Sequence, residues 1–512
     1  MAFPPPPPAV ATRIAEAQLI DSDTGVSPSV WRYVRASRAH VIIDAAAYFE
    51  LLQAAMLLAQ QRIMLVGWDF DTRIRLARGR RWWNLPRPQR FPARLGGFMV
   101  WLVQHRPQLQ IYVLRWNVAA LSFLLRGTMV FDLVRWYLSG SVKFRLDAAH
   151  PFGCSHHQKI AVIDDRLAAC GGIDVTGERW DTPEHLDDDP GRRRPNGKPY
   201  GPWHDLSMLV EGEAAEALGE LSRRRWLHSG GKALEPCRRQ VESAWPKGLT
   251  AEFADVEIGI ARTRAAWKAA PAVREIEALF VEQIAAAQRF IYAESQYFAS
   301  HRIAEAFARR LIEPDPPEIV LVTALASTSW LQQAAMDGAR VELMRALAGH
   351  DHARRFHVYV PHTAAGIPIY VHAKLMIIDD EILRIGSANL NNRSMGLDSE
   401  CDLFLDARRP ANSHIVPAIA SFRHRLLAEH CGMTEAAVCA RLSRQANMAA
   451  LIDDAAQDGK RLLPFALIPL SNTEKAIADS ALLDAERPEE IFEPMTRRRG
   501  LFRRGGLLRK PG

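Results

Sequence analysis

The sequence YVHAKLMIIDDEILRIGSANLNNRSMGLDSE, residues 370–400, decides how the rest of the chain is interpreted. It places His372 two residues before Lys374, and Asp379 five residues after that lysine. LMII is an apolar, partly β-branched run and DDE is typical of a turn, so the stretch predicts a strand–turn–strand hairpin. Residues two apart in a strand share a face, so we expect the His372 imidazole to lie beside the Lys374 ammonium group.

The same pattern occurs once more, earlier in the chain, in HHQKIAVIDDRLAACGGID at residues 156–174. His157, Lys159 and Asp164 have the same spacings, and a shift of 215 residues places them on the three residues of the later copy. A single HxK pattern carries little information, but two copies with matching apolar positions indicate an internal duplication. The same shift aligns the residues that follow, Gly172 with Ser387 and Asp174 with Asn389.

Two HxKxxxxD copies in one chain resemble the signature of the phospholipase D superfamily. The resemblance covers residues 35–432, and four further segments look like its phospholipid-acting branch: GGIDVTGERWDT (171–182), PWHD (202–205), ESQYF (294–298) and GSANLNNRS (386–394). Together with the duplication, it implies an α/β fold of two duplicated α/β/α sandwich lobes. The lobes would be related by a pseudo-twofold axis, with the active site at their interface.

The order of predicted elements divides the chain into five parts. Five consecutive prolines near the start favour an extended, disordered arm, and a polar stretch rich in Pro, Gly and charge at residues 183–202 favours a solvated loop or a lid. The predicted parts are the arm and lead-in (1–34), a first lobe (35–237), an inter-lobe connection (238–269), a second lobe (270–432) and a helical or irregular appendage with a basic tail (433–512).

The composition is ordinary for a globular protein, with 48% hydrophobic and 24% charged residues in 512. No uncharged apolar run approaches the roughly 18 residues of a spanning helix, and the first residues lack the pattern of a secretion signal. The six cysteines form no CxxC pair, which favours free thiols in a reducing compartment. We therefore expect a cytoplasmic protein that can associate peripherally with the inner face of the membrane. Cys154 beside His156 and His157 lacks a second ligand cluster, so no metal site is predicted.

The formal net charge of +7 comes from one end of the chain. Seven basic residues lie between Arg497 and Lys510 with no acidic residue among them, so the rest of the chain is nearly neutral. A nucleic-acid enzyme usually carries its positive charge across a folded groove, so nucleic acid is not the expected partner. The tail mixes arginines with leucines and Phe502, which suits an anionic membrane surface. The alternative is a disordered basic end without a partner.

The residue types of the two copies suit attack on a phosphodiester. Neutral imidazole is an uncharged nucleophile, and a second imidazole can donate a proton to the departing alkoxide. Lys159 and Lys374 would neutralise the phosphoryl oxygens, which makes a divalent cation unnecessary, and the resemblance implies no cofactor. The resemblance also implies that His157 is the nucleophile and His372 the general acid and base. The residues expected to line the phosphate site are Asp174, Asn389, Ser387 and Gly172.

Each histidine needs a carboxylate to fix its ring and tautomer. We expect Glu400 to hold His372, because it follows the second hairpin, and Asp205 of PWHD to hold His157. Asp164 and Asp379 complete the motifs, but strand alternation points them away from the lysines. Their expected work is to organise the hairpin turns through backbone hydrogen bonds.

These residues favour a phospholipase D-type phosphodiesterase or phosphatidyltransferase that cleaves the headgroup side of a glycerophospholipid through a phosphohistidine. The acceptor would be water or an alcohol, and both motifs in one chain favour a monomer. The alternatives are a cardiolipin synthase-like phosphatidyltransferase, then a phosphodiesterase or nuclease on nucleic acid, then a non-catalytic membrane-surface scaffold.

Overall fold

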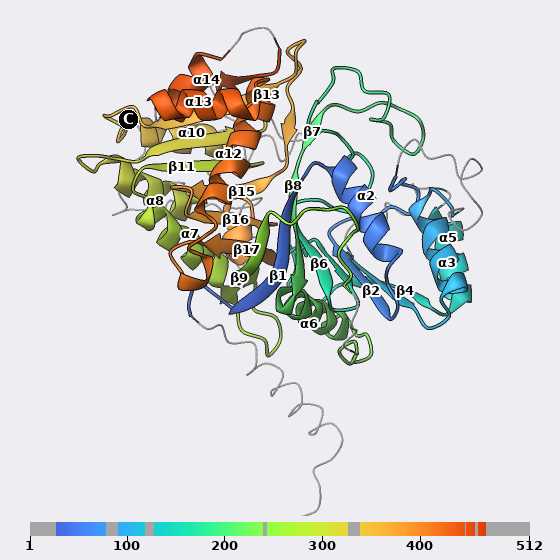
Figure 1. Cartoon of the computed structure of the whole chain (residues 1–512). Helices are drawn as coiled ribbons and strands as arrows, with labels where there is room; N and C mark the ends of the chain where they lie inside the picture. Colours follow the sequence, from blue (N-terminus) through green and yellow to red (C-terminus); the bar gives the residue numbers. More distant parts are fainter. Residues whose placement is uncertain are drawn as a thin grey trace, which may run out of the picture.

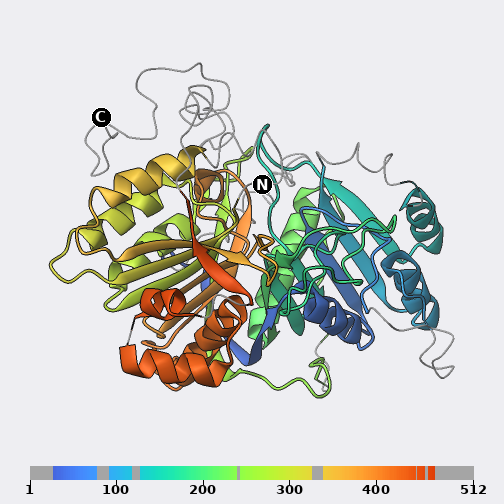
Figure 2. The ribbon, with the colours of Figure 1, turned by 90° about the horizontal axis from the view of Figure 1, so that it is seen from above.

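The computed structural model describes residues 27–77, 91–117, 127, 129–238, 243–325, 338–445, 447–455 and 459–466 of the chain. These residues form a mixed α/β structure built on one 16-stranded sheet, which confirms the predicted fold class. The first half of the chain lies on the right of Figure 1 and the second half on the left. Figure 2 shows the same two halves side by side from above.

The first half contributes seven strands to the large sheet. From its centre outward the order is β1 (Arg32–Ile43), β8 (Leu206–Gly212), β6 (Leu167–Gly171), β5 (Ile160–Ile163), β2 (Arg62–Gly67), β3 (Gln110–Trp116) and β4 (Val142–Asp147). The last three strands are parallel to one another, and β5 runs antiparallel to β2. The helices of this half are α2 (Ala45–Met56), α3 (Leu95–His105), α5 (Met129–Ser139) and α6 (Glu213–His228).

The second half repeats this order. Its strands from the centre outward are β9 (Phe253–Arg264), β17 (Glu400–Asp406), β16 (Ile382–Gly386), β15 (Lys374–Ile378), β11 (Phe290–Ser295), β12 (Glu318–Thr323) and β13 (Phe356–His362). Again the last three are parallel, and β15 runs antiparallel to β11. The helices are α7 (Glu275–Ala286), α8 (His301–Leu311), α10 (Gly338–Ala348), α11 (Asn392–Gly396) and α12 (Val416–Cys431).

The two halves meet where β1 and β9 pair in antiparallel register at the centre of the sheet. Equivalent strands of the two halves therefore follow one another in the same order from the centre of the sheet to each edge. Two strands have no equivalent in the described part of the first half: the edge strand β18 (Arg461–Pro464), which pairs with β13, and the short β10 (Val273–Arg274), which pairs with β9. This is the arrangement that an internal duplication predicts. Helices α13 (Glu435–Gln445) and α14 (Met448–Asp453) have no counterpart in the described part of the first half.

Parallel strands that are covered on both faces are fully buried, so their sequences are almost continuously apolar, as in β12. In β12, Val320 and Val322 join the hydrophobic core that contains α6 and α12. Ile319 and Leu321 of the same strand point to the opposite face and join the core that contains α7, α8 and α10. A third core packs α2 and α3 against the strands of the first half. The sheet is thus a rigid platform whose strand ends can carry a site.

One expectation from the sequence needs correction, and another holds only in part. The interval 238–269, expected to connect the lobes, contains β9, which hydrogen-bonds to both β1 and β17 at the centre of the sheet. The stretch 183–202, expected to be a solvated loop or a lid, is mostly exposed, but it also contains His185 and Arg192, which are 1% and 2% exposed. Both segments are anchored by partners distant in sequence, which local composition cannot reveal.

Some expectations lie outside the described residues, among them most of the arm at residues 1–34 and the basic tail between Arg497 and Lys510. Among the helices that the structure does describe, none is long and apolar enough to cross a membrane.

Candidate active site between the two halves

The two motif hairpins occupy equivalent places in the two halves. His157 lies just before β5 and His372 just before β15, whose first residue is Lys374. The Lys159 Nζ atom donates to the carbonyl oxygen of His157 at 2.9 Å, and Lys374 Nζ donates to the carbonyl oxygen of His372. Both lysines are buried. Each lysine is therefore hydrogen-bonded to the backbone of the histidine in the same motif.

The two histidines line one cavity of about 280 Å³ between the halves. Other side chains that line it carry charge, amide or aromatic groups: Trp68, Trp116, Asp174, Arg179, Trp203, Gln296, Tyr297, Tyr370, Asn389, Arg393, Asp398 and Glu400. Since a pair of imidazoles must face one phosphorus to act in sequence, a shared cavity is the arrangement that the proposed chemistry requires.

The ring of His157 is oriented through its Nδ1 atom. This nitrogen lies 3.0 Å from Glu400 Oε2, 3.1 Å from Glu400 Oε1 and 3.0 Å from the carbonyl oxygen of Ser387. The Ser387 carbonyl oxygen can only accept, so Nδ1 carries the proton and Nε2 is left with its lone pair for a ligand in the cavity. Glu400 is itself held by Ser387 Oγ at 2.5 Å and Ser394 Oγ at 2.7 Å.

His372 has the equivalent arrangement with Asp205, whose Oδ2 atom lies 2.7 Å from His372 Nδ1. The pairing predicted from the sequence was therefore wrong, because each histidine is held by the carboxylate of the other half. Backbone pairing between the halves explains the exchange. The short strands β7 (Trp203–His204) and β14 (Tyr370–Val371) run parallel, and the His157 backbone N–H donates to the carbonyl oxygen of Ser399 at 2.9 Å.

Burial dominates the electrostatics of the site. It raises the pKa of the Glu400 carboxyl to about 8, and it lowers the pKa of Lys374 to about 7. Burial, and next to it the positive lysines, hold the pKa values of His157 and His372 well below 6.5. The imidazoles are thus neutral near pH 7. An anion bound in the cavity would favour the protonated forms of Lys374 and the histidines.

The residues expected to bind phosphate have different roles in the structure. Asp174 pairs with Lys159 at 3.2 Å and accepts backbone N–H groups of Trp68 and Asp69 at 3.0 and 3.3 Å. It lines the cavity, but as a carboxylate that holds Lys159 it would repel a phosphate. The Ser387 hydroxyl is used by Glu400 and lies outside the cavity lining. These two expectations are corrected.

Gly172 and Asn389 complete that set. A Cβ atom at Gly172 would lie 2.0 Å from Asp205 Oδ1, so the glycine makes room for the carboxylate that holds His372. Asn389 does line the cavity, and its buried Oδ1 atom has no hydrogen-bond partner among the described residues. Asn389 is therefore the one member of the predicted set whose side chain the structure leaves available to a ligand.

Asp164 and Asp379 lie away from the cavity and anchor the hairpins to neighbouring strands. The Asp164 carboxylate accepts the backbone N–H groups of residues 60, 61 and 62 at 2.7, 2.8 and 2.6 Å. Asp379 does the same for residues 288, 289 and 290 at 2.6, 2.8 and 2.8 Å. Both residues have positive φ, 53° and 56°, as a tight turn requires. They are structural members of the motif.

Sequence reasoning missed several polar residues of the cavity, and two of them act on the side chains of the second motif. Arg179 stacks over Trp203, 4.3 Å from the ring centroid, and its charge lowers the pKa of His372. Gln296 accepts from Lys374 Nζ at 3.3 Å, where Lys159 has a carboxylate instead. Both residues lie in segments already noted in the sequence, GGIDVTGERWDT and ESQYF, and that was the available signal.

The described residues contain groups of neighbouring histidines and carboxylates that could hold a metal ion, and none of these groups includes His157 or His372.

Comparison with known proteins shows which family part of the chain resembles. A family model described as phospholipase D matches residues 348–461, which include the second hairpin. Phospholipase D1 of Schizosaccharomyces pombe is 24% identical over 379 residues, covering 54% of this chain and 27% of that protein. Phospholipase D alpha 1 of Carica papaya is 26% identical over 399 residues, covering 55% of this chain and 49% of that protein. The chain thus spans about half or less of the length of these relatives.

Among solved structures, phosphatidylserine synthase from Haemophilus influenzae Rd KW20 superimposes with a TM-score of 0.53. The match covers 81% of this chain and 90% of that protein, at 12% sequence identity. At this identity the likeness concerns the fold alone.

Proposed function

Because the chain belongs to the phospholipase D superfamily, we propose that it is a phospholipase D-type phosphodiesterase or phosphatidyltransferase, with a glycerophospholipid as its substrate. One observation carries the proposal. The imidazoles of His157 and His372 line the same cavity, and each has a carboxylate on Nδ1 that leaves Nε2 available to a ligand.

In the first step His157 Nε2 attacks the phosphorus of the headgroup phosphodiester. The N–P bond forms as the bond from phosphorus to the headgroup oxygen breaks, and His372 Nε2–H gives its proton to that oxygen, so the headgroup leaves as an alcohol. Charge on the phosphoryl oxygens is stabilised by Lys159 and Lys374. Binding of the anionic substrate raises the pKa of His372, so that this imidazole is protonated and can act as the general acid.

In the second step His372 acts as the base. It takes the proton of a water molecule or an alcohol, whose oxygen attacks phosphorus while the P–N bond breaks. Water gives phosphatidic acid, and an alcohol gives a new phosphatidyl ester. His157 returns to its neutral form, with its Nδ1–H still directed at Glu400.

The lipid substrate is supported by the names of the relatives and by the aromatic part of the cavity. Trp68, Trp116 and Trp203 offer apolar surface for the glycerol and acyl segments that do not react. Such a substrate requires the protein to work at a membrane surface, and its free cysteines suit a reducing cytoplasm. We propose the inner face of the membrane as that surface, and a monomer as the working form.

Product analysis on vesicles of phosphatidylcholine and phosphatidylglycerol tests the proposal. Released headgroup and phosphatidic acid are expected, with phosphatidylethanol or a glycerol ester when ethanol or glycerol is added. A preference for joining two phosphatidyl groups would identify the cardiolipin synthase-like alternative. Cleavage of single-stranded DNA without action on lipid would overturn the proposal in favour of a nuclease. Vesicle binding without any turnover would leave a scaffold.

A further inference from the structure

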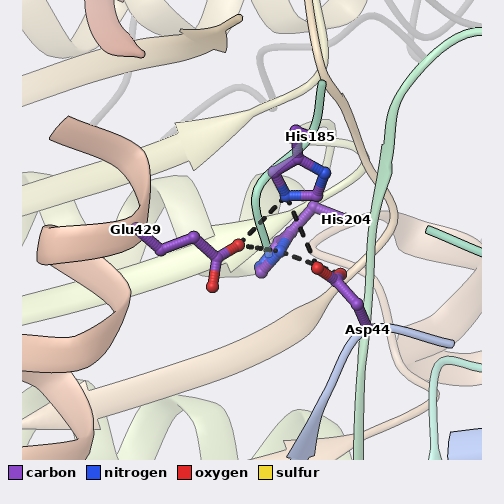
Figure 3. A group of neighbouring side chains, drawn as sticks. All are labelled: Asp44, His185, His204 and Glu429. Atoms are coloured by element: carbon purple, nitrogen blue, oxygen red, sulfur yellow. Dashed lines mark hydrogen bonds and ion pairs between the residues drawn. The ribbon is translucent and has the colours of Figure 1, made fainter. Parts of the chain in front are cut away.

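Four buried side chains meet in a second cluster, outside the cavity: Asp44, His185, His204 and Glu429. We refer to them as the four-residue cluster. Figure 3 shows them directed toward a common point from four different segments. Asp44 follows β1, His185 lies in the loop between β6 and β7, His204 ends β7, and Glu429 lies near the end of α12. The cluster therefore joins the first half of the chain to the last helix of the second half.

The cluster contains polar atoms without hydrogen-bond partners. Asp44 and His204 are both 0% exposed, yet among the described residues Asp44 Oδ2 and His204 Nδ1 make only ion-pair contacts inside the cluster and no hydrogen bond of good geometry. Buried polar atoms of this kind are rare and call for an explanation such as a bound ion. Asp44 also stands at the N-cap position of α2 without capping it, at a φ of 63°. Its side chain points to the cluster and therefore accepts no hydrogen bond from the first turn of the helix.

The distances inside the cluster match one type of ligand geometry. His185 Nε2 lies 3.5 Å from Asp44 Oδ2 and 3.1 Å from Glu429 Oε1. His204 Nδ1 lies 3.3 Å from Asp44 Oδ1 and 2.9 Å from Glu429 Oε1. A tetrahedral ion with bonds of about 2.0–2.1 Å requires ligand atoms about 3.3 Å apart. The four separations, which involve both oxygens of Asp44, lie within about 0.4 Å of that value, and one ligand atom from each residue can be chosen so that all four lie within 4.8 Å of one another.

The outer nitrogens of both histidines are held by further carboxylates. His185 Nδ1 lies 2.9 Å from Asp181 Oδ2, and His204 Nε2 lies 2.8 Å from Glu294 Oε2. Asp181 is in turn paired with Arg192 at 3.2 Å, and Glu294 accepts the Tyr292 hydroxyl at 2.6 Å. Carboxylate–histidine–metal chains of this form fix the tautomer that leaves the inner nitrogen free for the ion.

We propose that the four-residue cluster binds one divalent transition-metal ion, of the zinc type, as a structural centre joining the two halves. Two imidazole nitrogens and two carboxylate oxygens suit Zn²⁺ and its neighbours Co²⁺ and Mn²⁺, whereas Ca²⁺ and Mg²⁺ prefer oxygen ligands throughout. The ion is distinct from the chemistry at His157 and His372, where it has no ligand.

The centre also positions the site. The Asp205 backbone N–H donates to Asp44 Oδ1 at 3.1 Å, and the Asp44 N–H donates to the Asp205 carbonyl oxygen at 2.9 Å. Asp205 is the residue after His204 and holds His372 at 2.7 Å. An ion that fixes Asp44 and His204 thereby fixes the backbone that aims the His372 ring.

Elemental analysis of the untagged full-length protein tests the proposal. About one equivalent of zinc or a related metal per chain is expected after dialysis. Replacement by Co²⁺ should give the strong visible bands of a tetrahedral site. Removal of the metal with a chelator should lower Tm, and added Zn²⁺ should restore it in a concentration-dependent way. Asp44→Asn and His185→Gln should each lose most of the bound metal and the Co²⁺ bands.

His40→Gln is the matched control, because His40 is a partly buried histidine that faces a carboxylate, Glu252, 3.7 Å away and outside the cluster. It should keep the full metal content. Wild-type protein without metal, whose Tm does not respond to Zn²⁺, Co²⁺ or Mn²⁺, would overturn the proposal and leave a network of protonated histidines. Equal metal content in Asp44→Asn, His185→Gln and the wild type would show that the ion is not bound at the four-residue cluster. None of these readouts involves turnover, so failure of the proposed function would be seen separately.

Discussion

Glu400 Oε2 lies 3.0 Å from His157 Nδ1, although the two residues are 243 positions apart and belong to different halves of the chain. Asp205 and His372 form the reciprocal pair at 2.7 Å. Each histidine therefore depends on the other half for its orientation and tautomer. The duplication has not produced two independent sites, since neither half contains both its motif histidine and the carboxylate that orients it. This relationship makes the junction of the halves the sensitive point of the molecule.

Glu400→Gln should lower kcat by about 10²–10⁴-fold with little change in KM, because the amide no longer favours the His157 tautomer with a free Nε2. The measurement is steady-state hydrolysis of a soluble phosphodiester. Glu257→Gln is the control, since Glu257 pairs with Arg409 outside the cavity. An unchanged kcat in Glu400→Gln would contradict the role of this contact.

The two histidines should be separable by trapping the intermediate. With a good leaving group such as p-nitrophenolate the general acid is dispensable, so His372→Ala should still form a phosphohistidine and then stall. Intact-mass analysis and peptide mapping should place the adduct on His157. His157→Ala should form none. An adduct on His372 in that second variant would reverse the two roles while keeping the chemistry.

The pKa of about 7 at Lys374 predicts a pH dependence of substrate binding. In the free protein the ammonium group loses its proton as pH rises through this value. A bound phosphodiester favours the ammonium form, so its pKa in the complex lies higher. KM should therefore rise above about pH 7, whereas kcat should hold to higher pH. Lys374→Arg, whose guanidinium stays charged, should move the alkaline limb of kcat/KM upward. The same limb in Lys374→Arg and wild type would exclude Lys374 as its source.

Substitution of Gly172 tests whether the Asp205 carboxylate must lie directly against the backbone of this residue. In Gly172→Ala the new Cβ would lie 2.0 Å from Asp205 Oδ1, so the carboxylate must shift. We expect a loss of about 1–3 kcal/mol in the free energy of unfolding and a lower kcat. Gly201→Ala, where a Cβ meets nothing within 4 Å, is the control and should leave both unchanged. Denaturant unfolding and the same kinetic assay measure the two effects, and a silent Gly172→Ala would refute the need for close approach.

The sequence predicted the hairpins well because their signal is local. LMII and the repeated HxKxxxxD spacing set both the strand and the face on which His372 and Lys374 lie. It could not predict which carboxylate serves which histidine, since that follows from the parallel pairing of β7 with β14, far apart in the chain. Residues near 185 look solvated because their charges balance, yet His185 is buried by partners from the residue before α2 and from α12. Long-range pairing and buried charge are the features that local patterns lack.

Membrane binding should have two separable contributions if the substrate is a lipid. Helix α5 exposes apolar side chains on one face, with Phe131, Tyr137 and Leu138 at 71%, 84% and 76% exposure. The basic residues between Arg497 and Lys510, outside the described part of the structure, add charge at the other end of the chain. An apolar face binds through burial and a basic tail through attraction to anionic lipid, each basic residue contributing about 1 kcal/mol near the surface.

Truncation at Pro494 should therefore weaken binding to anionic vesicles, and the loss should shrink as salt rises, because salt screens the attraction. Serine at positions 131, 137 and 138 should weaken binding to neutral and anionic vesicles alike, with little dependence on salt. Both variants should hydrolyse a soluble phosphodiester at the wild-type rate, since a soluble substrate does not require binding to a membrane. Vesicle flotation at two salt concentrations measures the difference. Unchanged binding after truncation would remove the tail from the proposal, and unchanged binding of the serine variant would remove α5.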